Sequence, residues 1–254
     1  MALVLQIVVL PLVAFGLVQA FRVDPLIAVG VMLLAASPGG TTANLFSHLF
    51  RGDVALNVTL TAINSVLAAL TIPLITNLAI GFFDAGGTLG LQFGKVMQVV
   101  AIVLVPVAVG MVVRQRSASF ALRADRPVRA FSIVVLAAVS LGAIIGERES
   151  LGGYLREVGL VVTIFCLASL TLGYAGARLC RLSREQGIAS AMEVGIHNTT
   201  VALTIALSVL NSTAVAIPSA VYSIVMYFLA TAFGFAITRI GSAARQEAAE
   251  RVPA

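Results

Sequence analysis

The chain has 254 residues, of which 59% are hydrophobic and 11% are charged, and its mean hydropathy is +1.05. This composition is too apolar for a water-soluble domain and is typical of a polytopic membrane protein. The net charge of +5 does not indicate nucleic-acid binding, because the arginines lie in short loops between apolar stretches, where they set membrane orientation. Cys166 and Cys180 lack a metal-type spacing, so we expect neither a zinc site nor a disulfide framework.

Apolar stretches long enough to cross a bilayer, which takes about 20 residues, follow one another along the chain. We predict eight spans, at 1–20, 26–49, 54–81, 96–113, 129–146, 158–178, 187–210 and 214–238. No change of composition marks a soluble domain. Residues 1–254 are therefore predicted to form a single all-α membrane domain that ends in a cytoplasmic tail at 239–254.

Two of these spans are interrupted by residues that break helices. The span 26–49 contains Ser-Pro-Gly-Gly-Thr-Thr-Ala-Asn at 37–44, and the span 187–210 contains Glu-Val-Gly-Ile-His-Asn-Thr-Thr at 193–200. The breakers are Pro38, Gly39 and Gly40 in the first break and Gly195 in the second. In hydrocarbon, unwound backbone is tolerated only where protein buries it or it lines a cavity, and paired broken spans indicate a transporter's binding site. We therefore expect both breaks to line a binding site.

Basic residues are divided unevenly between the two sides of the membrane. If alternate loops share a side, one side holds only Arg22, Lys95, Arg148 and Arg156 of the sixteen Lys and Arg. Basic residues near span ends favour the cytoplasm, so both termini are predicted to be cytoplasmic. A signal peptide is the alternative for the first span, but the positive segment that it requires is missing. The lack of an extended targeting segment fits a bacterial inner membrane.

The order of the spans indicates an internal repeat. With this orientation, the three spans within 1–81 start from inside, the three within 158–238 start from outside, and each triplet has its broken span in the middle. Equal architecture with opposite insertion is the mark of an inverted-topology repeat. We predict a core domain at 1–81 plus 155–238 and a partial panel domain at 96–146. Two further spans are expected before residue 1, where the sequence opens directly into an apolar stretch.

Glu193 is the acidic residue that lies well inside an apolar span. A charge at the membrane centre costs about 2.5–3.5 kcal/mol on insertion scales, so an intramembrane carboxylate indicates a functional site. No Arg or Lys occupies a neighbouring turn to neutralise it. A bound cation would do so, whereas a protonated Glu in an interhelical hydrogen bond is the structural alternative.

A stripe of oxygen-bearing side chains follows the first break. Asn57, Thr61, Asn64 and Ser65 share one helical face, since their spacing is i, i+4, i+7 and i+8. Such residues are common as polar contacts between membrane helices, and that alternative stays open. Together with Asn44, Glu193 and unwound carbonyls, they favour a site for a hard cation, which prefers oxygen ligands.

The second break also contains a histidine, which could take up and release protons. His197 could carry protons near neutral pH or could be a neutral hydrogen-bonding residue. The sequence contains no nucleotide-binding glycine loop, nucleophile elbow or zinc-helix motif. This argues against a primary pump or an intramembrane hydrolase, so we do not expect an enzyme.

The two breaks, with Arg-Gly-Asp-Val-Ala-Leu at 51–56, resemble the signatures of the bile acid:sodium symporter family. The resemblance extends over essentially the whole chain. It implies ten transmembrane helices in two inverted repeats of five, with two crossed broken helices in a core domain that moves against a panel domain. Residue 1 would then lie in the family's third helix, so this chain would lack the first two panel helices.

The resemblance also implies two sodium sites and a substrate site. The first sodium site would use Asn44, Asn57, Thr61 and Glu193, and the second would use Gln6, Glu193, His197 and the carbonyls of Val194 and Ile196. Thr41, Asn198 and the adjoining Thr199 would lie near the substrate at the half-helix N-termini. Ala43 stands where a serine is found in a well-known member, and His197 stands where a glutamine is usual, which leaves sodium or proton coupling open.

From these features we expect sodium-coupled symport of a small organic anion, bile-acid-like or a small carboxylate, with no obligate protein partner. Met226 and Tyr227 replace a polar pair of that member, so the substrate does not follow from the resemblance. One alternative is a proton-coupled or exchange carrier for an organic anion or a metalloid oxyanion. Another is a non-transporting scaffold or an inactive fragment.

Overall fold

The computed structural model describes residues 1–85 and 151–250, together with isolated positions between 109 and 127. Within these residues the chain is helical and has no strand, apart from one isolated bridge between Gly39 and His197. The all-α prediction is thus confirmed. The spans predicted at 96–113 and 129–146, and with them the panel domain at 96–146, fall almost wholly outside the described residues.

Helices lie over the predicted spans that fall within the described residues, although the helix predicted at 158–178 begins at 151 and the one predicted at 214–238 continues to 250. In chain order they are α1 (Ala2–Val4), η1 (Leu5–Val9, a π-helical stretch), α2 (Leu10–Ala20), α3 (Pro25–Ala36), α4 (Thr41–Leu49), α5 (Val54–Phe82), α9 (Leu151–Leu179), α10 (Arg184–Gly195), α11 (Thr199–Thr204), η2 (Ile205–Val209, also π-helical) and α12 (Thr213–Glu250). Among the described residues, four helices are long and apolar enough to cross a membrane. They cover Ala2–Ala20, Val54–Phe82, Val158–Leu179 and Thr213–Arg239.

Side-chain caps explain where several helices begin. Asp24 accepts a hydrogen bond from the Leu26 N–H and precedes Pro25 at the first helical position, so α3 starts there. Asp53 likewise caps α5, because its side chain accepts a hydrogen bond from the Leu56 N–H. Ser183 forms a reciprocal capping box with Gln186 at the start of α10.

Both breaks are present where the sequence predicts them. α3 ends before Ser37, which is extended, and Gly40 is extended as well, with φ −109° and ψ 171°. α10 ends at Gly195, and Ile196 is extended. The Gly40 N–H donates to the Ile196 carbonyl at 3.3 Å, and the Asn198 N–H donates to the carbonyl of Pro38 at 2.8 Å. Each break therefore satisfies backbone groups of the other, which hydrocarbon cannot do.

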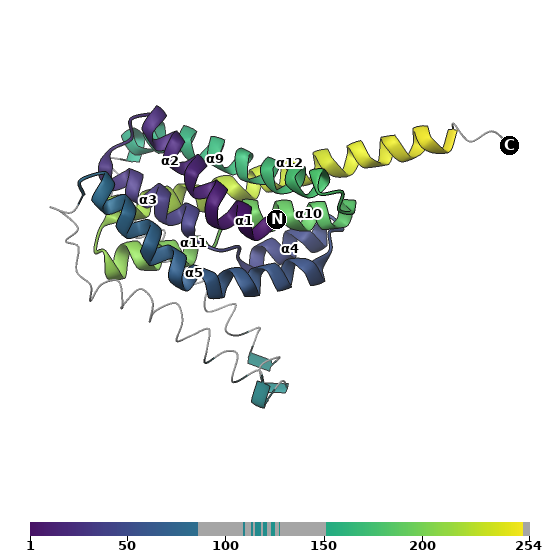
Figure 1. Cartoon of the computed structure of the whole chain (residues 1–254), viewed down its shortest axis with the longest axis horizontal. Coiled ribbons are helices and arrows are strands. Elements are labelled where there is room, and N and C mark those ends of the chain that lie inside the picture. The colour runs from purple at the N-terminus through teal and green to yellow at the C-terminus, as the bar shows by residue number, and fades with distance from the viewer. Residues whose placement is uncertain are drawn as a thin grey trace.

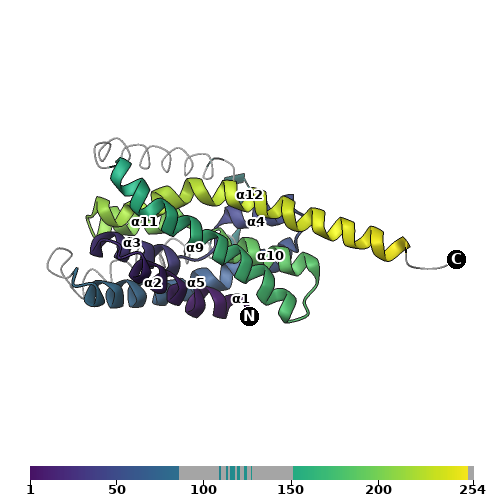
Figure 2. The same cartoon turned by 90° about the horizontal axis from the view of Figure 1, so that it is seen from above.

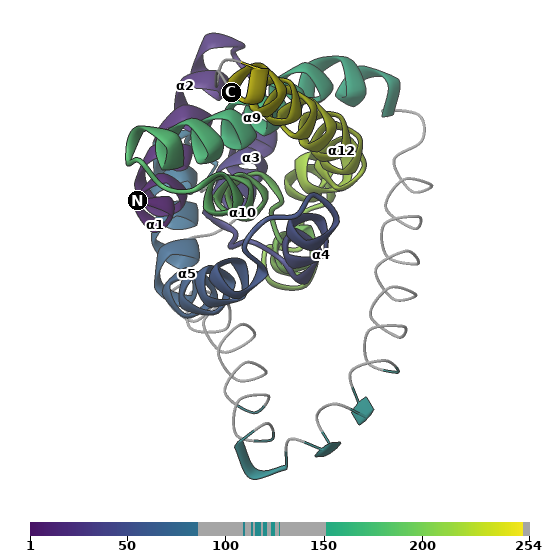
Figure 3. The same ribbon diagram turned by 90° about the vertical axis from the view of Figure 1, so that its right-hand side faces the viewer.

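α10 lies at the centre of the described helices. It packs against α9, α4, α5 and α12, and Figure 3 shows it encircled by them. Every residue from Gly187 to Gly195 is buried. α3 packs between α5 and α12, and α12 extends far beyond the bundle toward the C-terminus (Figures 1 and 2). The second break thus follows a helix that is buried along most of its length.

Gly30 provides a test of helix packing between α3 and α12. A Cβ at Gly30 would overlap the Val215 carbonyl and lie 2.9 Å from Pro218 Cγ. We predict that Gly30→Ala lowers the thermal unfolding temperature in detergent, because overpacking costs about 1–3 kcal/mol and helix propensity returns at most about 1 kcal/mol. Gly16→Ala is the control, since a Cβ there meets no described atom within 4 Å. Equal shifts for the two variants would contradict the close approach.

Candidate functional site

The Glu193 side chain is 1% exposed and reaches the crossing of the two breaks. Its carboxylate accepts hydrogen bonds from Thr61 Oγ1 at 2.5 Å and from Asn64 Nδ2 at 3.5 Å, and from the backbone of Gly39. These partners, drawn from α5 and the first break, are all neutral. Within the described residues, the carboxylate thus has hydrogen-bond partners but no cationic one.

Gly39 has no side chain and therefore leaves room for the Glu193 carboxylate. A Cβ at Gly39 would overlap the carboxyl carbon and both oxygens of Glu193. The first break therefore contributes more than a helix interruption, because its backbone passes directly beside the acidic group. Only glycine leaves that space, which explains the residue type at this position.

The polar stripe on α5 faces this carboxylate in part. Asn57 and Asn64 are buried, and Asn57 Nδ2 donates to the Ala189 carbonyl of α10 at 2.7 Å. Asn57 Oδ1 is buried without a hydrogen-bond partner, and so is Asn44 Oδ1 on α4. Ser65 instead donates to the Thr61 carbonyl of its own helix. The prediction of one shared face is correct, but Ser65 binds helix backbone.

A second polar cluster joins the π-helical stretch η1 to the breaks. Gln6 Nε2 donates to the Ser37 carbonyl at 2.9 Å and lies 3.2 Å from His197 Nδ1. His197 Nδ1 lies 3.0 Å from the same carbonyl. All three residues are buried, and Gln6 Oε1 and His197 Nε2 have no partner among the described residues. This cluster brings together residues from three distant parts of the chain.

Aromatic rings hold the imidazole of His197. The ring centroids of Phe165 and Tyr222 each lie 5.4 Å from that of His197, the first tilted and the second edge-on. Nδ1 donates to the Ser37 carbonyl when it carries the proton and accepts from Gln6 Nε2 when it does not. When Nδ1 carries the proton, Nε2 presents a lone pair that could bind a cation.

The remaining predicted residues lie along the breaks. Thr41 is exposed at the first turn of α4, and Asn198 caps α11 by accepting from the Val201 N–H at 3.3 Å. Thr199 is buried beside it. The Ile196 carbonyl is engaged by Gly40, while Val194 is buried at the end of α10. The structure thus links Gln6 to His197 and Thr61 to Glu193, and it joins Asn57 of α5 to the Ala189 carbonyl of α10.

Tyr222 is a residue that sequence reasoning missed. Its hydroxyl donates to the Gly195 carbonyl at 2.8 Å and also contacts the side chains of Cys166 and Ser169. This bond fixes the Gly195 carbonyl at the C-terminal end of α10. The carbonyls on either side, of Val194 and Ile196, are the two predicted to bind sodium. No local pattern signals this role, since a tyrosine in an apolar span is ordinarily a packing or interface residue.

The chemistry of the site suits a hard cation better than a transition metal. The described residues contain no group of three or more His, Cys, Asp or Glu side chains that could hold a metal ion. They offer instead one carboxylate, amide and hydroxyl oxygens, and unwound carbonyls. Such oxygen donors are the ligands of hard cations.

The bond between Tyr222 and Gly195 yields a prediction about stability. Tyr222→Phe should lower the free energy of unfolding by about 1–3 kcal/mol, because it leaves a buried carbonyl without a donor. Tyr227→Phe is the matched control on the same helix, since the Tyr227 hydroxyl donates to no described residue and its ring stacks on Phe46. Thermal unfolding of both variants in detergent is the measurement. A loss as large in Tyr227→Phe as in Tyr222→Phe would refute this role.

Comparison with known proteins identifies the family. The sequence profile of the Sodium Bile acid symporter family matches residues 1–153. The uncharacterized sodium-dependent transporter YocS of Bacillus subtilis is 30% identical over 223 residues, which cover 86% of this chain and 67% of that protein.

Two eukaryotic relatives show the same similarity. The human ileal sodium/bile acid cotransporter is 29% identical over 79% of this chain and 57% of its own length. The probable sodium/metabolite cotransporter BASS1, chloroplastic, of Arabidopsis thaliana is 28% identical over 87% of this chain and 54% of its own length. The chain spans between half and about two thirds of these relatives. The resemblance inferred from the two broken spans is confirmed, and the chain belongs to the sodium bile acid symporter family, a family of transporters and not of enzymes.

Proposed function

We propose that this protein is a secondary transporter that couples inward movement of sodium to symport of a small organic anion, bile-acid-like or a small carboxylate. The observation that carries the proposal is the buried Glu193 carboxylate, which lies between two broken helices and has only neutral described partners. A sodium ion would supply the missing positive charge. Similarity to YocS, the ileal cotransporter and BASS1, which are named as sodium-dependent transporters or sodium cotransporters, supports this proposal.

We infer two sodium sites that share Glu193. The first would use Asn44, Asn57, Thr61 and Glu193. Buried oxygens without partners on both asparagines support it, because a cation would satisfy them. The second would use Gln6, Glu193, His197 and the carbonyls of Val194 and Ile196. It is supported by the unpartnered Gln6 Oε1 and His197 Nε2 beside the second break.

Coupling would follow from the geometry of the breaks. Sodium bound on one side of the crossing would hold both breaks in place. The N-termini of α4 and of the helix Thr199–Val209 begin at these breaks. Their positive ends, with Thr41, Asn198 and Thr199, would then favour an anionic group of the substrate. Each ligand would thus raise the affinity for the other.

The architecture that we propose is an inverted repeat. The broken pair α3 and α4 lies between α2 and α5 in the chain, as the broken pair α10 and α11 lies between α9 and α12. With the spans predicted at 96–113 and 129–146 this gives eight spans, two fewer than the ten of the family pattern. The proposed core is 1–81 plus 155–238, and the proposed panel is 96–146. We propose a bacterial inner membrane with both termini in the cytoplasm, following the arginine distribution.

Proton coupling is the second candidate, favoured by the buried His197 with one unpartnered ring nitrogen.

The test is uptake by vesicles that contain the full-length protein, with an imposed sodium gradient or an imposed proton gradient and a panel of labelled carboxylates and sulfonates. Uptake that follows the sodium gradient alone is expected. Uptake that ignores sodium would reject the main proposal, and no uptake under either gradient would favour the scaffold or fragment alternative.

Glu193→Gln should reduce sodium-driven uptake more than any other single change, by about tenfold or more, because it removes the only formal negative charge of both proposed sites. Asn57→Ala or Thr61→Ala should raise the half-activating sodium concentration by about fivefold, the effect of one hydrogen-bonding group. Asp84→Asn is the control, since Asp84 is an exposed carboxylate outside the crossing. Protein abundance in the membrane is measured alongside. Normal uptake with unchanged sodium dependence in Glu193→Gln would refute the shared ligand.

His197 separates the two coupling modes. Once protonated, an imidazole has no lone pair and adds a positive charge. Lower pH should therefore raise the sodium concentration for half-maximal uptake, and His197→Gln should flatten this dependence while keeping sodium coupling. A proton-coupled carrier should instead lose pH-driven uptake in His197→Gln. Sodium activation is measured at two pH values for both proteins, and an identical pH response in parent and variant would exclude His197 from either role.

A further inference from the structure

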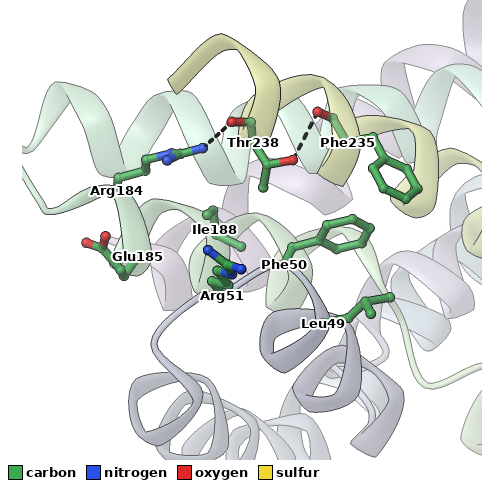
Figure 4. Close-up of a pocket in the computed structure, with 8 residues that line it drawn as sticks. All are labelled: Leu49, Phe50, Arg51, Arg184, Glu185, Ile188, Phe235 and Thr238. Atoms are coloured by element: carbon green, nitrogen blue, oxygen red, sulfur yellow. Dashed lines mark hydrogen bonds between the residues drawn. The ribbon is translucent and has the colours of Figure 1, made fainter. Parts of the chain in front are cut away.

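A pocket of about 430 Å³ lies away from the crossing, where α4 ends and α10 begins. Figure 4 shows its lining residues, which come from the end of α4, the loop after it, the first two turns of α10 and the part of α12 near the end of its apolar stretch. None of the residues proposed for sodium or substrate lines it. A volume of a few hundred Å³ is ordinary for a small-ligand site.

One wall of the pocket is cationic. The guanidinium of Arg51 makes no hydrogen bond or ion pair with a described residue. Arg184 is held in a fixed position, because its Nη2 donates to the carbonyls of Ile237 and Thr238 at 3.0 and 2.7 Å. Glu185 also lines the pocket and has a partner of its own. In Figure 4 its carboxylate points away from the aromatic side. The lining therefore has a net positive charge.

The other wall is apolar and opens outward. The rings of Phe50 and Phe235 meet edge to face at 5.3 Å, and Phe235 and Leu49 are 55% and 61% exposed. Large exposed apolar side chains of this kind suit contact with lipid tails. A soluble phosphate would contact the arginines but leave this wall unused. A ligand with an anionic head and an apolar tail would use both walls.

The pocket also lies where the apolar stretches of two helices end. The apolar part of α12 ends at Arg239, directly after Thr238, and α4 ends at Leu49. Arg51 lies in a loop and Arg184 begins α10 directly after another loop, on the side that holds most of the basic residues and is favoured for the cytoplasm. Anionic phospholipids collect in that leaflet, and basic pockets between helices on this side bind their headgroups.

We propose that this pocket binds the headgroup phosphate of an anionic phospholipid, with Arg51 and Arg184 as its cationic contacts and Phe50, Phe235 and Leu49 against the first part of the acyl chains. Arg51, whose guanidinium is free of described partners, is the residue available to form a bidentate bond with the phosphate. Arg184 adds charge while it holds α12 to α10. The site is independent of the transported anion.

The test is native mass spectrometry of the full-length protein in detergent, with phosphatidylglycerol and phosphatidylcholine of matched chains as probes. Preferential retention of phosphatidylglycerol is expected, and Arg51→Gln should weaken it about fivefold, the effect of one basic residue near a membrane surface. Arg22→Gln is the matched control. Arg22 has a left-handed backbone like that of Arg51, with φ 49° against 60°, but lies at the opposite end of the broken span. It should leave retention unchanged.

Arg184→Gln is a second variant, which should also weaken lipid retention. Its thermal unfolding is measured as well, because the substitution also breaks the hydrogen bonds to α12. Glycerol phosphate is added as a soluble competitor. Three results would overturn the proposal: equal retention of the two lipids, an equal loss in Arg22→Gln and Arg51→Gln, or displacement by glycerol phosphate at the same concentration as by lipid. The last result would assign the pocket to a soluble phosphate compound instead.

Discussion

The hydrogen bonds between the two breaks are the constraint on which the described structure depends. Unwound backbone inside a membrane domain must find its partners in protein, because lipid tails offer none. Here Gly40 binds Ile196 and Asn198 binds Pro38, so neither break is stable without the other. This mutual dependence fixes α10 at the centre of the bundle. It also brings an acidic side chain and an imidazole, four residues apart, to the same crossing.

Glycine and small residues make this crossing possible. Helices in lipid associate by close packing and polar contacts, since apolar surface gains little by leaving a hydrocarbon solvent. Gly39 leaves room for the Glu193 carboxyl group, a Cβ at Gly195 would meet Leu170, and Gly30 brings α3 against the α12 backbone. Gln6, Asn57 and His197, which contact the breaks or α10, also carry buried polar atoms without described partners. Close packing together with buried oxygens that lack hydrogen-bond partners is what we expect of a cation-binding site.

Neutral partners around Glu193 suit the proposed role better than an arginine would. A fixed cation would neutralise the carboxylate in every state, so sodium binding could not change the charge of the site. Hydroxyl and amide groups stabilise the carboxylate only in part, and they leave a net charge for a mobile cation to balance. The second cluster adds a group that can titrate, because His197 Nε2 has no described partner. Ion binding and backbone order at the breaks would then be linked.

The sequence by itself determined the features that are local along the chain. Proline and glycine inside apolar runs predicted both breaks, a lone acid in such a run identified Glu193, and helical spacing placed Asn57 and Thr61 on one face. The tertiary structure alone decided which distant groups meet: the shared Ser37 carbonyl, the Tyr222 bond to Gly195 and the arginine pocket. Periodicity reports one helix's own faces, whereas these contacts depend on how separate helices pack, and no spacing within one segment encodes that packing.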